Sequence, residues 1–234
     1  MKLLGVIPAR EGSKGRRNKN IVLLCGKPLI YYTIKCALDS KVFEKVIVST
    51  DSEKIAEISK KYGAEVPFLR PKELATDQAK GIDVLIHAME WIERNFKKFD
   101  AVMYLQPTSP LRTVEDIKLS LEIFQRKNAN SVVSVTEVDH HPYWSNTIPP
   151  DGKMDNFIRP EYRNRNRQEL PKFYRLNGAI FLAKWDYIKK TKDWFAENSY
   201  AYIMPRERSI DIDSEVDLVL AEYFLKKRGD CFEG

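Results

Sequence analysis

Short apolar runs of strand-forming residues alternate along this chain with longer segments whose apolar positions recur every three or four residues. The runs predict buried strands at residues 2–8, 44–50, 101–105 and 131–135. The periodic segments predict helices at residues 28–38, 52–62, 82–96 and 113–124. Because alternating strands and helices are typical of a parallel sheet covered by helices, the pattern predicts an α/β fold with three layers and a mostly parallel sheet.

The alternation stops between residues 139 and 171, where proline, asparagine, arginine and aromatic residues follow no period. A long irregular insertion in a compact domain is usually functional or pairs with another subunit. The pattern resumes with strands at residues 178–182 and 200–204 and a last helix at residues 214–227. We therefore predict a single domain over residues 1–234 that carries an arm at about residues 139–171.

The composition, with 43% hydrophobic and 31% charged residues, is that of a folded globular protein. The N-terminus has no signal-peptide pattern, and no segment approaches the ~20 apolar residues that a membrane span requires. Cys25, Cys36 and Cys231 are scattered and odd in number. We therefore expect neither a disulfide framework nor a zinc cluster, and a reducing cytoplasm is the location that fits best.

A formal net charge of +6 is compatible with binding to nucleic acid, to an anionic membrane or to small polyanionic substrates. The basic residues concentrate in two loops, at residues 10–19 and 159–175, and form neither a stripe along a helix nor a polybasic tail. This distribution favours a pocket for phosphates and carboxylates, and we expect no nucleic-acid or membrane partner.

A basic loop with the sequence PAREGSKGRRNKN directly follows the first predicted strand. Ligands of open α/β sheets bind beyond the carboxyl ends of the strands, so this is where a nucleotide would lie. Gly12 and Gly15 allow backbone amides to converge on an anion, and Arg10, Lys14 and Lys19 supply positive charge. The loop lacks the spacing of a Walker A motif or a dinucleotide fingerprint. It predicts a triphosphate site in a Rossmann-like nucleotide-binding domain, with a solvated basic loop as the alternative.

An acidic pair, Asp211 and Asp213, precedes the last predicted helix. Carboxylates two positions apart in an extended segment point the same way and can share a hard cation, so the pair predicts a site for Mg²⁺ or Mn²⁺. The alternative is that Asp213 or Ser214 only caps the helix, with further carboxylates in its first turn.

Together these segments resemble the CMP-sialic acid synthetases, the acylneuraminate cytidylyltransferase family. The basic loop is similar to the family signature P-A-R-x-G-S-K-G-x-x-x-K-N, and other motifs follow in the family's order over nearly the full chain. They are VSTD (48–51), RPxxLATD (70–77), LQPTSPLR (105–112), RQELP (167–171), NGAI (177–180) and IDIDS (210–214). The chain departs from the family at Lys80-Gly81, where many members have two small hydroxyl residues, and at Arg16-Arg17, which replace a proline of some members.

The resemblance implies a cytidylyltransferase that joins CMP from CTP to a sialic-acid-like, acidic nine-carbon sugar and releases pyrophosphate, in the biosynthesis of cell-surface polysaccharide. It implies a homodimer in which the arm reaches toward the partner's active site. Catalytic roles fall to Arg10, Lys19 and Asp211, and the metal site to Asp211 and Asp213. The nucleotide would be bound by Arg10, Gly12, Ser13, Lys14, Gly15, Lys19, Asn20, Arg70 and Asp77. The sugar would be bound by Gln106, Thr108, Ser109, Arg167, Gln168 and Asn177.

Residue chemistry alone leaves other interpretations open. The segment 108–112 could be a simple turn after a strand, and most arginines of the arm could form a solvated face. The three histidines are assigned no role, and the pair Tyr143-Trp144 is expected to make an interface or core contact. For the whole protein, the alternatives are a related sugar nucleotidyltransferase with another nucleotide or sugar, and a non-catalytic RNA-binding module suggested only by the basic charge.

Overall fold

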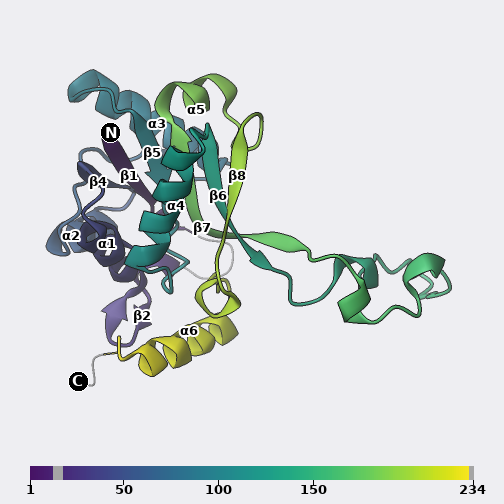
Figure 1. Cartoon of the computed structure of the whole chain (residues 1–234). Coiled ribbons are helices and arrows are strands. Elements are labelled where there is room, and N and C mark those ends of the chain that lie inside the picture. Colours follow the sequence, from purple (N-terminus) through teal and green to yellow (C-terminus); the bar gives the residue numbers. More distant parts are fainter. Residues whose placement is uncertain (13–17, 232–234) are drawn as a thin grey trace.

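A six-stranded sheet with the strand order β4-β1-β5-β7-β6-β8 forms the centre of the protein (Figure 1). The structure is a computed structural model that describes residues 1–12 and 18–231. The strands are β1 (Leu3–Pro8), β4 (Lys45–Ser49), β5 (Ala101–Tyr104), β6 (Ser131–Glu137), β7 (Tyr174–Lys184) and β8 (Ser199–Ile203). Strand β1 is parallel to β4 and β5, and β6 is parallel to β8, whereas β7 is antiparallel to both of its neighbours. The prediction of a mostly parallel sheet is confirmed.

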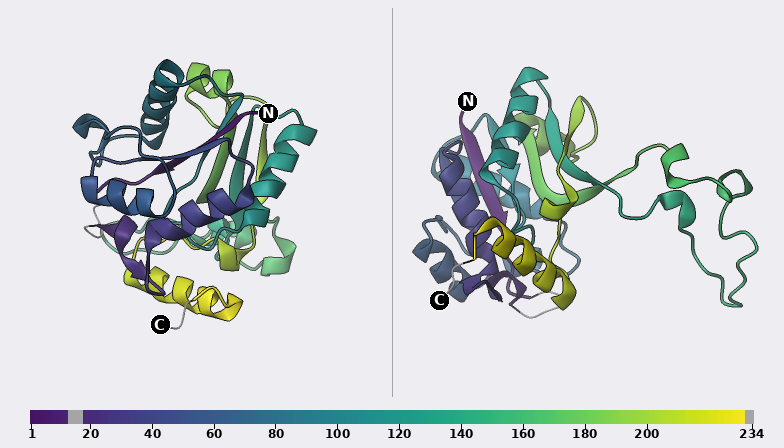
Figure 2. Two further views of the ribbon diagram at one scale, coloured as in Figure 1. Left: turned by 90° about the vertical axis from the view of Figure 1, so that its left-hand side faces the viewer. Right: turned by 60° about the horizontal axis from the view of Figure 1, so that its bottom comes forward.

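Helices cover both faces of this sheet, so the three-layer prediction is also confirmed (Figure 2). The helices are α1 (Leu29–Ser40), α2 (Glu53–Lys61), α3 (Gly81–Asn95), α4 (Val114–Arg126), α5 (Trp185–Thr191) and α6 (Glu215–Arg228). Successive side chains of β1 point to opposite faces of the sheet, so this strand contributes to the core on both sides. Leu3 and Ile7 pack toward α1, α2 and α4. Leu4 and Val6 pack toward α3 and α5. The sequence pattern did not predict α5, which has only seven residues.

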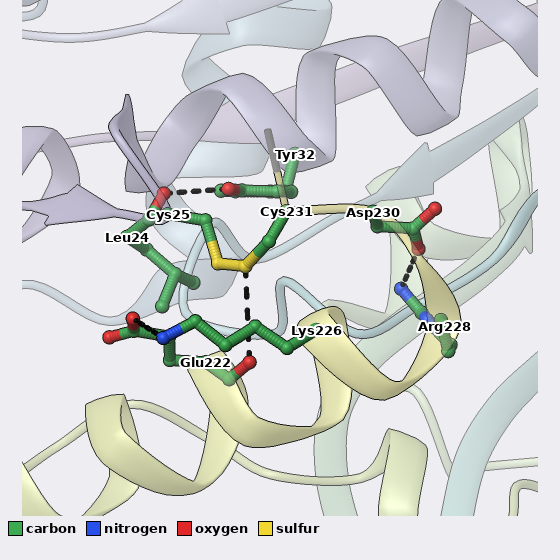
Figure 3. Close-up of a disulfide and its surroundings, with 8 residues drawn as sticks. All are labelled: Leu24, Cys25, Tyr32, Glu222, Lys226, Arg228, Asp230 and Cys231. Atoms are coloured by element: carbon green, nitrogen blue, oxygen red, sulfur yellow. Dashed lines mark hydrogen bonds and ion pairs between the residues drawn. A yellow bond between two sulfur atoms is a disulfide. The ribbon is translucent and has the colours of Figure 1, made fainter. Parts of the chain in front are cut away.

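A third apolar cluster lies below the sheet, where α6 packs on the hairpin formed by β2 (Leu23–Leu24) and β3 (Lys27–Pro28). In this cluster Cys25 and Cys231 form a disulfide (Figure 3). Their Cα atoms lie 5.1 Å apart although 206 positions separate them in the sequence. The expectation of no disulfide is therefore wrong, because folding brings together two cysteines whose spacing carried no signal. The third cysteine, Cys36, is a buried free thiol whose pKa burial raises to about 11.

The arm projects away from the sheet (Figures 1 and 2). Its stem consists of the ends of β6 and β7, which continue to pair beyond a bulge between Val133 and Val135. Beyond the stem, residues 139–171 contain only short 3₁₀ turns, at Pro142–Trp144, Pro160–Tyr162 and Arg167–Glu169. Since little of this segment packs on the body, the arm presents its surface to another molecule or to solvent.

In the part of the chain that the structure describes, no helix combines the length and the apolar character needed to cross a bilayer.

Candidate functional site

A cavity of about 290 Å³ opens at the carboxyl ends of β1 and β5, and we call it the cleft. It collects many of the site residues that the sequence predicted. Those that line it are Arg10, Lys19, Asn20, Arg70, Asp77, Gln106, Thr108, Asp211 and Asp213. They come from segments that are far apart in the sequence, which places the cleft where an open α/β sheet binds its ligands.

The basic loop is closed by hydrogen bonds between its two ends. The side-chain amide of Asn20 donates to the backbone oxygen of Arg10 at 2.9 Å, and Asn18 N–H donates to the Glu11 oxygen at 3.2 Å. The Glu11 N–H donates to Asp51 at the end of β4 at 3.0 Å. Asn20 is buried, so its first role is to hold the loop in a closed shape beside β1.

Other loop residues lie outside the cleft or outside the described part of the chain. Gly12 is exposed and does not line the cavity. The predicted nucleotide contacts Ser13, Lys14 and Gly15 fall outside the described residues. The described contacts of the loop are therefore those of its two ends.

Two arginines connect the loop to the segment 70–77. Arg10 forms an ion pair with Asp77 at 2.6 Å, and its guanidinium also donates to the Ala75 oxygen at 3.4 Å. Arg70 is buried, and it donates to the Ser49 hydroxyl at 3.1 Å and to the Ser49 backbone oxygen. Burial, helped by the nearby Arg10 charge, lowers the pKa of Arg70. Arg70 therefore fixes the wall of the cleft, whereas Arg10 remains partly accessible to a ligand.

Replacing Asp77 with asparagine is expected to weaken the binding of a nucleoside triphosphate with little effect on stability. The Arg10–Asp77 pair is partly exposed, so its loss should change the free energy of unfolding by less than about 1 kcal/mol. Arg10 loses the partner that orients it, which should weaken triphosphate binding about three- to tenfold, the value of one hydrogen bond. Calorimetric titration of nucleoside triphosphates measures the effect. Asp186→Asn, which breaks the remote exposed pair of Lys98 and Asp186, is the control, and equal triphosphate affinity in both variants would contradict the role of Asp77.

The basic loop and the acidic segment meet inside the cleft. Lys19 Nζ lies 2.9 Å from Asp213 Oδ1, although the two residues are 194 positions apart. The structure therefore brings the predicted anion site and the predicted cation site together in space.

The backbone around the acidic pair is held from both sides. Ile212 N–H donates to the Thr108 oxygen at 2.8 Å, and Asp213 N–H donates to the Asp217 carboxylate at 3.1 Å. Ser214 forms a capping box with Asp217 at the start of α6. The capping alternative is therefore correct for Ser214, and it leaves the Asp213 side chain free to contact Lys19.

Asp211 carries an unsatisfied oxygen. Its Oδ1 atom is buried and has no hydrogen-bond partner among residues 1–12 and 18–231. Burial raises the pKa of Asp211, and the carboxylates of Asp213 and Asp217 add to this, whereas a hydrogen bond from Thr108 and the charge of Lys19 oppose it. A buried carboxylate oxygen without a partner is suited to a hard cation.

The acidic pair fits a magnesium ion that takes its other ligands from the substrate. In the described ranges, no group of three or more His, Cys, Asp or Glu side chains could hold a metal by itself. Mg²⁺ is usually bound through one or two carboxylates together with substrate phosphates and water. Two aspartates are therefore the donor set expected of an ion that arrives with a triphosphate.

Gly178 lies against two residues that line the cleft, Gln106 and Asp211, a role that its motif alone did not reveal. Its φ is +73°, and an added Cβ would lie 2.5 Å from Gln106 Oε1 and 3.5 Å from Asp211 Oδ2. Both the left-handed backbone and the close approach of these two side chains require glycine. Strand β7 can therefore pass close to Gln106 and Asp211.

The predicted sugar-binding residues separate into three groups. Gln106 and Thr108 line the cleft. Ser109 and Asn177 are buried, and Asn177 accepts from Ser134 at 2.6 Å and donates to Ser209 at 2.9 Å. Their side chains support the cleft from behind.

The third group lies on the arm. Arg167 and Gln168 line a separate cavity at the base of the arm, where Arg167 approaches Glu137 at 3.8 Å. Within one chain they do not line the cleft.

The turn after β5 is held by a buried arginine that sequence reasoning did not single out. Arg112 donates to the Ala179 oxygen at 2.6 Å, to Thr33 Oγ1 at 2.7 Å and to the Gln106 oxygen at 3.4 Å. The alternative of a simple turn at residues 108–112 is thus correct for the backbone. The same turn also places Thr108 in the lining of the cleft. The segment is therefore both a turn after a strand and a part of the candidate site.

An ion pair anchors the segment that leads into the acidic pair. The guanidinium of Arg208 donates to both oxygens of Asp116, at 3.0 and 2.8 Å, and Tyr202 Oη donates to Asp116 at 2.8 Å. Asp116 is 0% exposed. Burial alone would raise the pKa of Asp116, but the hydrogen bonds from Arg208, Thr113 and Tyr202 outweigh it and hold the pKa below the ordinary value. The sequence predicted the helix whose first turn contains Asp116, but not this ion pair.

Comparison with known proteins gives a consistent result. A family model described as "Cytidylyltransferase" matches residues 4–169. A relative from Escherichia coli O18:K1:H7, named N-acylneuraminate cytidylyltransferase, is 41% identical over 230 residues, which cover 97% of this chain and 53% of that protein. A relative from Legionella pneumophila, named CMP-N,N'-diacetyllegionaminic acid synthase, is 39% identical over 234 residues, with 97% of both chains covered. The chain thus spans about half the length of the first relative and nearly all of the second.

A solved structure shares the fold. It is described as CMP:2-keto-3-deoxy-manno-octonic acid synthetase complexed with CTP, and it matches with a TM-score of 0.73 at 17% identity over 97% of this chain and 100% of that chain.

Proposed function

The chain belongs to the cytidylyltransferase family, and on this premise we propose that it transfers the CMP group of CTP to a nonulosonic acid and releases pyrophosphate. The observation that carries the proposal is the contact between Lys19 and Asp213, which joins the basic loop and the acidic segment in one cleft. Cationic side chains and a carboxylate pair side by side are what a triphosphate with its divalent ion requires.

In the proposed reaction the anomeric hydroxyl of the sugar attacks the α-phosphorus of CTP in line, and pyrophosphate leaves. The protein contributes mainly position and charge, so no nucleophilic side chain is needed. Arg10 and Lys19 bind the phosphates at the reacting end, and Gln106 and Thr108 line the sugar side. Asp211, which lines the cleft, would assist removal of the hydroxyl proton, either as a carboxylate base or by holding the cation.

Asp211 and Asp213 are the residues that would hold Mg²⁺ or Mn²⁺. When bound, the ion offsets the negative charge that develops on the triphosphate.

The substrate is tested by mixing the protein with CTP, magnesium and a panel of neuraminate, legionaminate and pseudaminate, and by measuring pyrophosphate release. Release is expected only when CTP and one of these acids are both present. ATP, GTP and UTP serve as controls for the nucleotide, and a simple sugar phosphate for the acceptor. Release with a control nucleotide or a sugar phosphate would support the related nucleotidyltransferase instead. Salt-sensitive RNA binding without any turnover would support the RNA-binding module.

A homodimer completes the proposed enzyme. Arg167 and Gln168 do not line the cleft of their own chain, and the arm that carries them exposes Ile148 and Met154. Helix α6, which begins next to the acidic pair, also exposes an apolar stripe. The stripe consists of Val216, Val219, Leu220 and Tyr223. Contiguous exposed apolar surface marks an interaction site, and a second copy that exchanges arms would cover it and bring Arg167 to the partner's cleft.

Complementation between two inactive variants tests the exchange of arms. Arg167→Ala damages the arm and Asp211→Asn damages the cleft, so each protein alone is expected to lose most of its turnover. When the two are co-expressed, half of the dimers contain both variants, and one of their two sites has an intact arm and an intact cleft. Turnover of about a quarter of the wild-type value is then expected. No recovery, or a monomeric mass in sedimentation, would contradict the exchanged dimer.

We also propose a cytoplasmic location, because CTP is made there, and a role in the biosynthesis of cell-surface polysaccharide. The disulfide between Cys25 and Cys231 argues in the other direction, since disulfides are rare in the cytosol. Thiol labelling of the protein in intact cells decides between them. Reduced, labelled Cys25 and Cys231 are expected in the cytoplasm, and protection of both thiols would contradict that location.

A further inference from the structure

Tyr104, the last residue of β5, carries a hydroxyl group that the proposed mechanism does not use. The residue lines the cleft but is only 6% exposed, and its ring contacts Phe181 in the core. No hydrogen bond to the hydroxyl is found among residues 1–12 and 18–231. A buried polar group that borders a cavity and lacks a partner is available to a ligand.

The hydroxyl occupies space that Gly81 leaves open. A Cβ atom added to Gly81 would lie 3.1 Å from Tyr104 Oη and 3.7 Å from Tyr104 Cζ. Gly81 begins α3 with a helical backbone, and alanine would ordinarily be favoured at such a position. The glycine is therefore explained by the nearby phenol and not by the backbone.

The two walls of the cleft differ in chemistry. Charged groups lie where the basic loop meets the acidic pair, at Lys19, Asp211 and Asp213. The lining near Tyr104 includes the small and apolar residues Leu74, Ala79, Gly81 and Val84, together with the buried guanidinium of Arg70, whose charge acts on the phenol. A nucleoside triphosphate placed with its phosphates on the charged side brings its flat, largely apolar base against the second wall.

We propose that the Tyr104 hydroxyl, in the room provided by Gly81, binds the base of the nucleotide directly and contributes to the selection of cytosine. This rests on the proposed function. Burial raises the pKa of Tyr104 to about 12, so at neutral pH the phenol stays protonated and can both donate and accept a hydrogen bond. The pyrimidine ring of CTP offers a carbonyl oxygen and an unprotonated ring nitrogen as acceptors and an amino group as donor.

The arrangement accounts for the departure from the family at Lys80-Gly81. Where many members carry small hydroxyl residues at these two positions, this chain has none. Strand β5 supplies a hydroxyl from the facing side of the cleft, at the place where a side chain on residue 81 would otherwise project. Residues 81 and 104 should therefore behave as a coupled pair.

The test is calorimetric titration of CTP, UTP and inorganic tripolyphosphate, each with magnesium, into wild type and Tyr104→Phe. Phenylalanine keeps the ring in the core and removes only the hydroxyl. CTP affinity is expected to fall about three- to tenfold, and the preference for CTP over UTP to decrease. Tripolyphosphate affinity should not change, because the phosphates bind on the other wall. Equal CTP affinity in both proteins would overturn the proposal.

A second substitution tests the coupling. Gly81→Ala should weaken CTP binding in the wild-type background, where the new methyl group displaces the hydroxyl, but not in the Tyr104→Phe background. Equal losses in both backgrounds would assign Gly81 a role that is independent of Tyr104. The outcomes also distinguish failure of the proposed function from failure of the role of Tyr104 alone. If the wild type does not bind CTP, the proposed function fails; if it binds CTP and Tyr104→Phe binds it equally well, only the role of Tyr104 fails.

Discussion

Replacing Asp211 with asparagine lowers turnover by about 10²-fold or more and at the same time raises the melting temperature of the metal-free protein. The loss of activity is expected because asparagine removes the charge that, in the proposed mechanism, would hold the cation and assist proton removal. The gain in stability follows because Asp211 Oδ1 is buried without a partner, so that the charged carboxylate costs free energy in the folded state. Thermal unfolding and pyrophosphate release, measured on the same preparations, check both effects.

The pH dependence of this stability gain has a definite sign. Burial raises the pKa of Asp211 in the folded protein above the unfolded value. The folded state then binds more protons than the unfolded state, and stability falls as pH rises through this range. Asp211→Asn should therefore match wild type in acid and exceed it once the pH has passed the folded pKa. Asp213→Asn is the control, because that side chain is exposed and paired with Lys19. A variant at 211 that is less stable than wild type at neutral pH would contradict this explanation.

Replacing Arg208 with alanine has the largest expected effect on stability, a loss of about 3 kcal/mol in the free energy of unfolding. The substitution leaves the carboxylate of Asp116 fully buried without its bidentate partner. Denaturant titration measures the loss. Arg206→Ala is a matched control, since Arg206 pairs with Asp139 at an exposed position and its removal should cost less than about 1 kcal/mol. Similar losses for both arginines would show that burial of Asp116 does not determine the effect.

Acid unfolding provides a second measure of the same ion pair. The hydrogen bonds hold the pKa of Asp116 below its unfolded value, so the pair's contribution is complete above the unfolded pKa. It is lost as pH falls through the folded pKa. Arg208→Ala should therefore unfold at a higher pH than wild type during acid titration. Activity should fall as well, because Arg208 holds the segment that carries the acidic pair.

Hydrophobic periodicity predicted the fold well where elements are long and buried. Strand β1 and helices α3 and α4 lie within one or two residues of their predicted bounds, because their apolar positions face a core on one or both sides. Helix α5 and the β2–β3 hairpin are too short to show a period.

The direction of β7 follows from the arm. If β7 were parallel to β6, the chain between them would have to form a crossover connection, which usually contains a helix. Residues 139–171 are irregular instead and connect β6 to β7 as a long hairpin. The absence of a helical period in that segment is therefore a signal for the antiparallel strand.

The candidate site was predictable as far as its chemistry lies in local motifs. The basic loop predicted an anion site and the acidic pair predicted a cation site. The structure joins the two segments through Lys19 and Asp213. Contacts that depend on tertiary packing carried no such signal. The phenol of Tyr104 above Gly81, the ion pair of Arg208 with Asp116 and the disulfide are of this kind.

The binding of CTP with and without magnesium tests the central claim most directly, namely that the basic loop and the acidic pair together hold one nucleoside triphosphate through a divalent ion. Calorimetric titration of wild type is expected to show CTP affinity at least about tenfold higher with magnesium than without it. In Asp211→Asn this difference should disappear, while in Lys19→Ala binding should be weak under both conditions. CTP affinity that does not respond to magnesium, to Asp211 or to Lys19 would contradict the account.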